Sequence, residues 1–430
     1  MRKHAKKSRH LQAVQRAARA TVEIPLPLLG AFVGIERSYF DLCIHAGQQV
    51  LDAMMEQDRE ELCGPRWQRD PDRQAGRAGT TPSEVTLGGR RVRMTRPRVR
   101  TRAGRELDLP SFAFAAQRDP LDAHALNAIA CGISTRKYAR SLDPLPADVG
   151  ERATSKSAVS RRYVALTTKQ LTTWLTTPLG DRHFPIVLID GIVLGDHTVV
   201  IALGIDIAGN KQILGLREGH TETTAVATAL LQDLVARGLD PAWAHLFVID
   251  GARALSSAIG KVFGALAVTQ RCQIHKRRNI LGHLPEHMHA NVASVLRDAW
   301  DTADVALATR RLKRLAASLE TDHPGAAASV REGLDDTLTL QRLGVTGALY
   351  QKLRSTNAIE NLNSGIVTYA RNVKRWRGGS MVVRWVSAAV VEAEKTFRRV
   401  HGWRNLKTLV TALSDLECNK NEEVSAERIA

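Results

Sequence analysis

Cysteine is scarce in this sequence, which has five in 430 residues, and they lack the regular spacing of a disulfide framework. Long apolar runs are missing too, since none approaches the roughly 20 residues of a membrane-spanning helix. The N-terminal stretch has no clear cleavage site of a secretory signal. We therefore expect a cytoplasmic protein in a reducing compartment, with no disulfides and no membrane contact. The cysteines are Cys43, Cys63, Cys131, Cys272 and Cys418.

Acidic residues are in deficit. Lys and Arg number 61 against 44 Asp and Glu, which gives a net charge of +17 and a pI near 10.1. A high-arginine genome would also raise the pI, but here the excess is clustered, and this favours a polyanionic partner, with nucleic acid foremost. The apolar fraction of 44% is enough to fill real cores, and the length allows two or three domains.

The first 121 residues are predicted to hold three parts. Residues 1–20 carry seven Lys or Arg and no acid, which is typical of an extended basic arm. Apolar residues recur at helical spacing from about 30 to 62, which predicts an amphipathic helix or helix pair. Gly88-Gly89 then joins two runs of β-forming residues, as expected of a tight hairpin. The region 21–121 thus combines helix with an arginine-rich ribbon.

The second strand of this ribbon is dense in arginine: eight of residues 90–105 are Arg and none is acidic. Such a basic ribbon is able to lie along a DNA backbone or enter a groove. A solvated, charged edge strand would show the same pattern. The candidate DNA-binding residues are Arg90, Arg91, Arg93, Arg96, Arg98 and Arg100.

Residues 122–182 have helical periodicity on both sides of a proline-rich break, which resembles a helix-turn-helix DNA-binding domain. The connection over residues 143–154 is longer than usual for that motif, so a plain helical pair stays open. If the second helix is a recognition helix, its N-terminal end presents Lys156, Ser157, Arg161 and Arg162 to DNA.

From residue 183 the pattern changes to three apolar strands followed by alternating helices and strands, in the order βββαβαβα. This order is that of an RNase H-like α/β core with a mixed sheet. We place its first part at 183–285, an all-helical insertion at 286–350, a second part at 351–405 and a C-terminal polar tail at 406–430. In this sheet the first and fourth strands are neighbours.

Two carboxylates stand out in that order. Asp190 is expected at the end of the first, central strand and Asp250 at the end of the fourth, so that both meet at one place. Paired carboxylates suit two Mg²⁺ ions, with Mn²⁺ as an alternative, which activate a nucleophile and stabilise the leaving oxygen in phosphoryl transfer. Gly191 and Gly251 would keep the backbone small where a phosphate approaches. Asp196 and Asp206 sit by hairpin turns and are expected to be structural.

The third carboxylate is predicted to be Glu360, in "RSTNAIENLN". A helix start alone would also explain it, with Asn357 as N-cap and Glu360 three residues later as in a capping box. The surroundings favour DNA, because they are rich in side chains that bind phosphate and sugar. Trp376 is suited to stacking on an unpaired base, or equally to surface packing. The candidates here are Arg354, Asn357, Lys374, Arg375, Trp376 and Arg377.

Cys272 and His275 are spaced as Cys-x-x-His at a strand-to-helix junction. A structural zinc site needs four ligands, and the nearby histidines lack finger spacing, so we expect the pair to fix the corner beside Asp250 by packing and hydrogen bonding. The cations next in the chain, Lys276, Arg277 and Arg278, would flank a DNA path or form a solvated helix face.

The ordered series "LIDG", "VIDGARAL", "RCQIH", "RSTNAIENLN" and "NVKRWRGG", spread over roughly 130 to 405, resembles the mutator-type DDE transposases of bacterial insertion sequences. The resemblance implies that Asp190, Asp250 and Glu360 form a catalytic triad on an RNase H-like fold, and that Cys272 and His275 are the family's Cys-x-x-His signature. After Glu360 the sequence departs from the family's usual arginine-rich segment.

The same resemblance implies that the protein is a nucleoid-associated homodimer or higher oligomer acting on double-stranded DNA. It would bind terminal inverted repeats and catalyse metal-dependent strand cleavage and transfer. Two other classes stay open from the residues alone: a sequence-specific DNA-binding protein or domesticated transposase without catalysis, and a nuclease that cleaves without joining.

Overall fold

The computed structural model describes residues 35–429, with gaps at 69–72, 74, 88–89, 118–128, 130–132, 135–136, 142–150 and 153–155. The basic arm and the first predicted helix of the 122–182 region thus lie wholly or mostly outside the described residues. The chain divides into two compact units, Met1–Leu166 and Thr167–Ala430. Within the described ranges, no helix combines the length and hydropathy needed to cross a lipid bilayer.

The first unit packs one long helix against a small sheet. Helix α2 (Ile35–Cys63) confirms the predicted amphipathic helix, as a single element. Strands β1 (Ala75–Leu87) and β2 (Arg90–Thr101) pair antiparallel with Leu87 opposite Arg90, which confirms the hairpin. The short strands β3 (Glu106–Leu107) and β4 (Glu151–Arg152) both pair with β2. A small apolar core joins α2, the hairpin and α3 (Pro110–Gln117).

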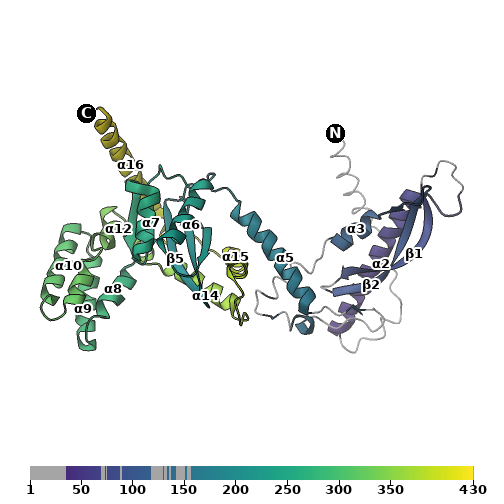
Figure 1. The fold of residues 1–430 in the computed structure, drawn as a ribbon, viewed down its shortest axis with the longest axis horizontal. Helices are drawn as coiled ribbons and strands as arrows, with labels where there is room; N and C mark the ends of the chain where they lie inside the picture. The colour runs from purple at the N-terminus through teal and green to yellow at the C-terminus, as the bar shows by residue number, and fades with distance from the viewer. Residues whose placement is uncertain are drawn as a thin grey trace. The chain divides into compact units, whose positions relative to one another are not determined.

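The second unit contains a five-stranded mixed sheet with strand order β7-β6-β5-β8-β9. Its strand β5 is labelled in Figure 1. Strand β5 (Ile186–Leu194) is central, antiparallel to β6 (His197–Ile205) and parallel to β8 (His245–Ile249). Strands β7 (Lys211–Gly219) and β9 (Ala267–Arg271) complete it. With helices α6 (Thr224–Ala236), α7 (Arg253–Phe263) and α8 (Gln273–Leu281), the elements follow the expected order βββαβαβα.

Successive residues of a strand point to opposite faces of the sheet, and this decides which side the carboxylates occupy. Val187 and Ile189 of β5 belong to the core that α6 and α7 form on one face. Asp190 therefore points to the other face, where α14 (Asn357–Ala370) contacts β5 and α15 (Gly379–Glu394) contacts β7. Asp250, following Ile249 of the α6–α7 core, is in register for the same side as Asp190.

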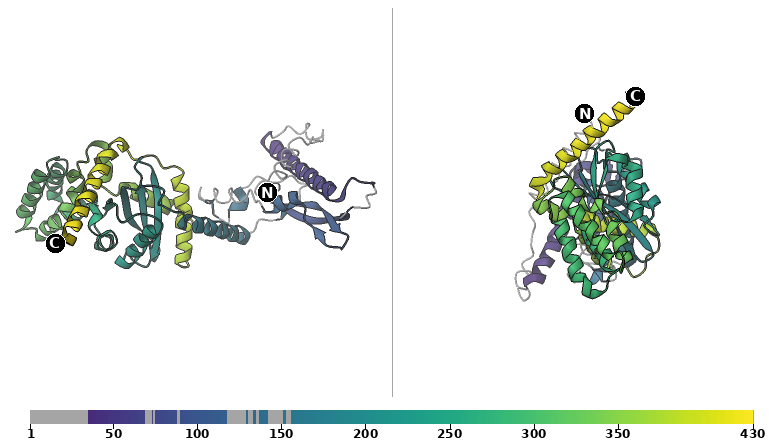
Figure 2. Two further views of the ribbon diagram at one scale, coloured as in Figure 1. Left: turned by 90° about the horizontal axis from the view of Figure 1, so that it is seen from above. Right: turned by 90° about the vertical axis from the view of Figure 1, so that its left-hand side faces the viewer.

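The segment between α8 and α14 is helical, as predicted, and its described residues contain no strand. It comprises α9 (Glu286–Trp300), α10 (Val305–Leu319), α11 (Pro324–Arg331), η4 (Asp335–Leu338), α12 (Thr339–Arg342) and α13 (Gly347–Leu353). These helices lie to one side of the sheet (Figures 1 and 2). The insertion has its own apolar core and is tied to edge strand β9, because Thr339 Oγ1 donates to Thr269 O at 2.7 Å.

The predicted polar tail is a helix. After η5 (Trp403–Asn405), helix α16 runs over Leu406–Ile429. Its first turns are packed, since Leu406, Leu409 and Leu413 are buried. This apolar spacing of three and four residues precedes the polar stretch, and the helix continues through it. Helix α5 (Lys156–Leu175) spans the sequence position at which the two units divide. Two short 3-10 helices are also described, η2 (Tyr138–Ser141) and η3 (Gly264–Leu266).

Candidate active site

Asp190 lies in the middle of β5, so the prediction that the strand ends there is wrong. Residues 191–194 continue the strand because each pairs with β6, as far as Leu194 opposite His197. The parallel partner β8 stops earlier, with Leu188 opposite Val248 as the last pair. Asp190 therefore stands where one neighbouring strand has already ended. Its carboxylate has access to the segment that leaves β8.

Asp250 is the first residue of that segment, directly after Ile249. Its Oδ1 accepts a hydrogen bond from the Ala252 backbone N–H at 2.8 Å, an interaction that fixes the turn into α7. Cys272 N donates to Ile249 O at 2.7 Å, which ties the start of α8 to the same corner. The predicted adjacency of the first and fourth strands is confirmed, and it brings Asp190 and Asp250 to one site.

The charges of this site act on one another. Burial, as the largest effect, and then the negative charge of Asp250 raise the pKa of Asp190 to about 6, and Glu360 adds to the rise. A hydrogen bond from the Gly191 backbone N–H lowers the pKa in part. Asn363 Nδ2, on α14, also donates to Asp190 Oδ2, at 2.8 Å. Because electrostatic shifts of this kind need nearby charges, Asp190, Asp250 and Glu360 share one electrostatic environment.

Glu360 lies in the first turn of α14, and its carboxylate is turned toward a neighbouring hydroxyl. The N-cap of α14 is Thr356, not Asn357, so the capping-box interpretation is wrong. Thr356 Oγ1 donates to Glu360 Oε1 at 2.6 Å, side chain to side chain. The hydroxyl thus holds the carboxylate in place, in addition to the backbone of Thr356 starting the helix.

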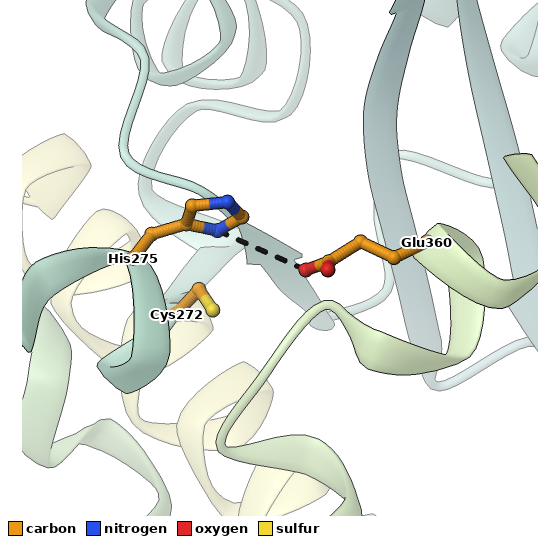
Figure 3. Close-up of side chains that lie close together, drawn as sticks. All are labelled: Cys272, His275 and Glu360. Carbon is orange, nitrogen blue, oxygen red and sulfur yellow. Dashed lines mark ion pairs between the residues drawn. The ribbon is translucent and has the colours of Figure 1, made fainter. Parts of the chain in front are cut away.

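Cys272 and His275 complete this network (Figure 3). His275 Nδ1 lies 3.9 Å from Glu360 Oε1 and 3.4 Å from Thr356 Oγ1, while Thr356 N donates to Cys272 Sγ at 3.5 Å. Burial alone would raise the pKa of Cys272, but hydrogen bonds to His275 and Thr356 lower it. The bond to Cys272 raises the pKa of His275. The pair sits at the β9–α8 junction, where the spacing placed it.

Two donor sets are candidates for a metal ion. Within the described part of the chain, Cys272, His275 and Glu360 are the group whose donor atoms lie within 4.8 Å of one another. The Thr356 hydroxyl contacts all three of these side chains. Asp190, Asp250 and Glu360 offer only carboxylate oxygens, the ligands that Mg²⁺ prefers. The donor atoms of this second set do not all lie within 4.8 Å of one another in the metal-free protein. A shared divalent cation would draw them together and offset the repulsion that, after burial, raises the pKa of Asp190.

Sequence reasoning missed the place of two residues beside the carboxylates, although it counted Asn363 among the polar side chains expected to bind phosphate and sugar. One is Asn363, which holds Asp190, and the other is Glu222, in the loop between β7 and α6. Burial first, then the charges of Asp250 and Asp190, raise the pKa of Glu222 to about 7. Nothing in "GHTETT" distinguishes this glutamate from the polar start of a helix. Only the folded topology places it at the site.

The two glycines after the aspartates have close neighbours within the protein, whereas the predicted approach of a phosphate to them stays a prediction. A Cβ at Gly191 would lie 2.8 Å from Glu222 Oε2, and a Cβ at Gly251 would overlap the Arg271 guanidinium. Gly251 also has φ +100, a backbone conformation that favours glycine. Both glycines therefore make room for side chains of the protein.

Asp206 and Asp196 are the two acids expected to be structural. Asp206 accepts from Ala208 N and Asn210 N in its turn, and Asp196 is exposed.

The arginines of β2 fall into two groups. Arg93 and Arg100 are exposed. Arg96 and Arg98 are partly buried and share Glu106, to which Arg98 Nη2 donates at 2.7 Å and Arg96 Nη2 at 3.1 Å. Part of the positive charge of the ribbon is thus neutralised within the unit. The side chains of Arg90 and Arg91 lie outside the described residues.

At the start of α5, the side chains of Lys156, Ser157 and Arg161 are exposed, and that of Arg162 is outside the described residues. After β9 the cations differ: Arg278 is exposed and Arg277 partly so, whereas Lys276 is buried and donates to Glu332 O of the insertion. Burial and the charge of Arg271 lower the pKa of Lys276 to about 8. Lys276 therefore faces the protein interior.

Around α14 the candidates are also placed differently. Asn357, Lys374, Arg375 and Arg377 are exposed. Arg354 Nη1 donates to Asp301 Oδ1 at 2.8 Å, across the insertion. Trp376 packs over the β5–β6 turn, where a Cβ at Gly195 would lie 2.8 Å from its Cδ1. Of the two predictions for Trp376, surface packing therefore describes its position in the structure.

The chain is similar to known proteins over most of its length. Residues 35–400 match the model of the family described as Transposase, Mutator family. The transposase for insertion sequence element IS256 in transposon Tn4001 of Staphylococcus aureus is 25% identical over 358 residues, covering 80% of this chain and 87% of that protein. The transposase for element ISRM5 of Rhizobium meliloti is 27% identical over 366 residues, covering 84% and 89%.

A third relative, the transposase for element IS1081 of Mycobacterium tuberculosis, is 24% identical over 379 residues, covering 85% of this chain and 87% of that protein. The family model spans both units and includes Asp190, Asp250, Cys272, His275 and Glu360. The chain therefore belongs to the mutator family of transposases.

Proposed function

We propose that this protein binds the terminal inverted repeats of an insertion sequence and catalyses strand cleavage and strand transfer, with Asp190, Asp250 and Glu360 as a DDE triad. The observation that carries the proposal is the topology: β5 and β8 are neighbours that carry Asp190 and lead into Asp250, and α14, which carries Glu360, contacts β5 and binds Asp190 through Asn363. The strand order β7-β6-β5-β8-β9 and the element order support an RNase H-like identity for the sheet.

In this proposal the three carboxylates hold two divalent cations, Mg²⁺ or Mn²⁺, which would supply Lewis-acid activation of the attacking and leaving oxygens. The protein's own part is positioning. Asn363 holds Asp190 by one hydrogen bond, and Ala252 N–H holds Asp250. Thr356 holds Glu360, with His275 and Cys272 behind it. This network gives the Cys-x-x-His pair a positioning role rather than a zinc-binding one.

The DNA-binding part of the proposal rests on the exposed cations. These are Arg93 and Arg100 on the ribbon, Lys156 and Arg161 on α5, Arg278 on α8, and Lys374, Arg375 and Arg377 after α14. The same proposal includes the domain boundaries predicted from the sequence. It also includes assembly of the protein as a homodimer or higher oligomer on two element ends. Lys276 has no part in it, because its side chain is buried against Glu332.

The test is a reaction of the purified full chain with a DNA fragment that carries both element ends, in Mg²⁺ or Mn²⁺, analysed on a sequencing gel. We expect nicks at the ends and products joined to target DNA. Binding without cleavage would show a DNA-binding protein without catalysis, and nicks without joined products would show a nuclease. Either result would overturn the proposed strand transfer.

The matched variants are Asp190→Asn, Asp250→Asn and Glu360→Gln, which remove charge without changing side-chain size. Each should lower cleavage at least about a thousandfold, a loss of roughly 4 kcal/mol of transition-state stabilisation, while end binding changes little. Asp196→Asn, with the same charge change at an exposed turn, is the control. Full cleavage by Glu360→Gln would move the third ligand to another residue.

A further inference from the structure

Glu222 is a partly buried acid with one buried oxygen that has no hydrogen-bond donor among the described residues. It lies between β7 and α6, and its Oε1 is buried and accepts no hydrogen bond within the described part of the protein. The residue does not cap α6, since that position belongs to Thr223, whose side chain accepts from Val226 N. A buried carboxylate oxygen without a donor destabilises the fold unless something else compensates its charge.

The position of Glu222 points to what compensates it. Its Oε2 lies beside the backbone of Gly191, the residue next to Asp190, where only a glycine leaves room. Although residue 191 faces the α6 side, β8 pairs with β5 only as far as Leu188, so no strand closes the sheet between Gly191 and Asp250. The charges acting on Glu222 are those of Asp250 and Asp190, and both are negative.

Asn363 provides a second, independent observation. This residue is only 8% exposed and comes from α14, on the opposite face of the sheet from α6. Its Nδ2 donates to Asp190, but its Oδ1 is buried and has no partner within the described residues. Two unpartnered oxygens, from Glu222 and Asn363, therefore border Asp190 from different elements. Carboxylate and amide oxygens are ligands for hard divalent cations, or for water bound to them.

We propose that Glu222 is a fourth carboxylate ligand of this site, binding the same divalent cation as Asp190 and Asp250. The inference rests on the proposed two-metal function. Asn363 serves as the positioning residue of Asp190 on the other side. In this arrangement Asp190 on β5, Glu222 after β7 and Asp250 after β8 bind the cation together. Glu360 reaches the site from α14. The positive charge of the cation would then offset the cost of placing Glu222 beside two other acids.

The experiment is a Mn²⁺ titration of the full chain without DNA, followed by electron paramagnetic resonance of free Mn²⁺. Four proteins are compared: the unchanged chain, Glu222→Gln, Asp190→Asn and the exposed control Asp196→Asn. We expect Glu222→Gln to raise the Kd for Mn²⁺ about tenfold or more and the control to leave it unchanged. Melting of the metal-free proteins is the second readout. There Glu222→Gln should raise the Tm, because it removes a buried charge.

The outcomes separate this inference from the function on which it rests. If Glu222→Gln binds Mn²⁺ like the unchanged chain while Asp190→Asn does not, the fourth ligand is overturned and the triad stands. If the unchanged chain and Asp190→Asn give the same titration, the proposed metal site fails, and Glu222 with it. A lower metal-free Tm for Glu222→Gln would indicate a purely structural role. If Glu222→Gln does not fold, Glu222→Asp is titrated with Mn²⁺ instead, because it keeps the charge and withdraws the carboxylate oxygens by one methylene. A raised Kd for Mn²⁺ supports the fourth ligand, and an unchanged Kd overturns it.

Discussion

The raised pKa of Asp190 shows that ionising this carboxyl is unfavourable in the metal-free site. Its pKa of about 6 stands well above the ordinary value of 3.8, and the difference corresponds to roughly 3 kcal/mol between its two protonation states. Glu222 is shifted in the same direction by burial and by the same neighbours. Burial first, and repulsion between the acids second, therefore disfavour the ionised carboxylates of the metal-free protein, where the proposed reaction needs cations. This cost is measurable as a dependence of stability on pH.

For both acids the folded-state pKa lies above the unfolded one, so protonation favours the folded state. This stabilisation is complete below about pH 4 and is lost as the pH rises through about 6 and 7. His275, whose pKa is also raised, acts in the same direction; Asp250 and Glu360 are the other charged groups facing the site. We expect the Tm of the metal-free chain to fall between about pH 5 and pH 8.

The readout is the melting curve of the unchanged chain against that of Asp190→Asn/Glu222→Gln across this range. The double variant should gain most at the higher pH, with about 2–4 °C for each kcal/mol regained. Mg²⁺ should remove most of the difference. A double variant with the same pH profile as the unchanged chain would show that these acids do not carry this cost.

Thr356 is the residue through which Glu360, His275 and Cys272 are connected. Thr356→Val keeps the shape of this fully buried side chain and removes its hydroxyl. We expect cleavage to slow about tenfold at unchanged DNA affinity, with about 1–2 kcal/mol lost from the free energy of unfolding. Thr356→Ser should recover most of the rate, because it restores the donor. Equal rates for the valine and serine variants would exclude a role for the hydroxyl.

At this scale the sequence predicts the three carboxylates of the proposed triad but not their neighbours. Asp190 and Asp250 could be predicted because each ends or interrupts an apolar run and their strands are adjacent in the expected sheet. Glu222 and Asn363 could not, since each has the local context of an ordinary helix start or helix interior. Their role depends on contacts with residues far away in the chain, such as Asn363 with Asp190.

Elements were predictable where hydrophobic periodicity is strong, and less so where an element ends. The strands and helices from β5 to α8 follow the expected order, because each apolar run is bounded by turn residues. The end of β5 was predicted too early, at Asp190-Gly191. An acid followed by glycine is typical of a strand end, but pairing of Ile192, Val193 and Leu194 with β6 extends the strand.

The hairpin of β1 and β2 allows a sharp test at the scale of one element. Arg93 and Arg100 are exposed, whereas Arg96 and Arg98 are held by Glu106. Arg93→Gln/Arg100→Gln should weaken DNA binding and flatten its salt dependence by about 0.9 in the logarithmic slope for each phosphate that is no longer bound. The matched pair is Arg96→Gln/Arg98→Gln, which should change the slope less. If both pairs change it equally, the exposed face of the ribbon does not bind the DNA.

At the scale of the whole chain, the insertion is held to the sheet by buried polar contacts. Lys276 and Arg271, at the β9–α8 corner, both donate to Glu332 O between α11 and η4. Sequence patterning predicted the insertion as helical but assigned Lys276 to DNA. A basic run looks solvated, and only the packing of the insertion on the sheet shows that one of its members is covered.

The two compact units predict a heat denaturation with at least two transitions in calorimetry. Leu312→Ala, in the core of the insertion, should lower the free energy of unfolding of Thr167–Ala430 by about 2–5 kcal/mol. Only the melting temperature of that unit should therefore fall. Val92→Ala, buried in the hairpin, should lower only the other one. Mg²⁺ should raise the transition that Leu312→Ala lowers. A single transition that moves with both substitutions would show that the units unfold together.

The central claim is that acids from β5, the end of β8 and α14 converge on divalent cations. The most direct measurement is a crystal structure of the full chain with Mn²⁺, with anomalous scattering recorded at the manganese absorption edge. We predict anomalous peaks between Asp190 and Asp250, at about 2.0–2.3 Å from their carboxylate oxygens, with Glu360 as a further ligand. A well-ordered structure with manganese beside Cys272 and His275, and none beside Asp190, would contradict this claim.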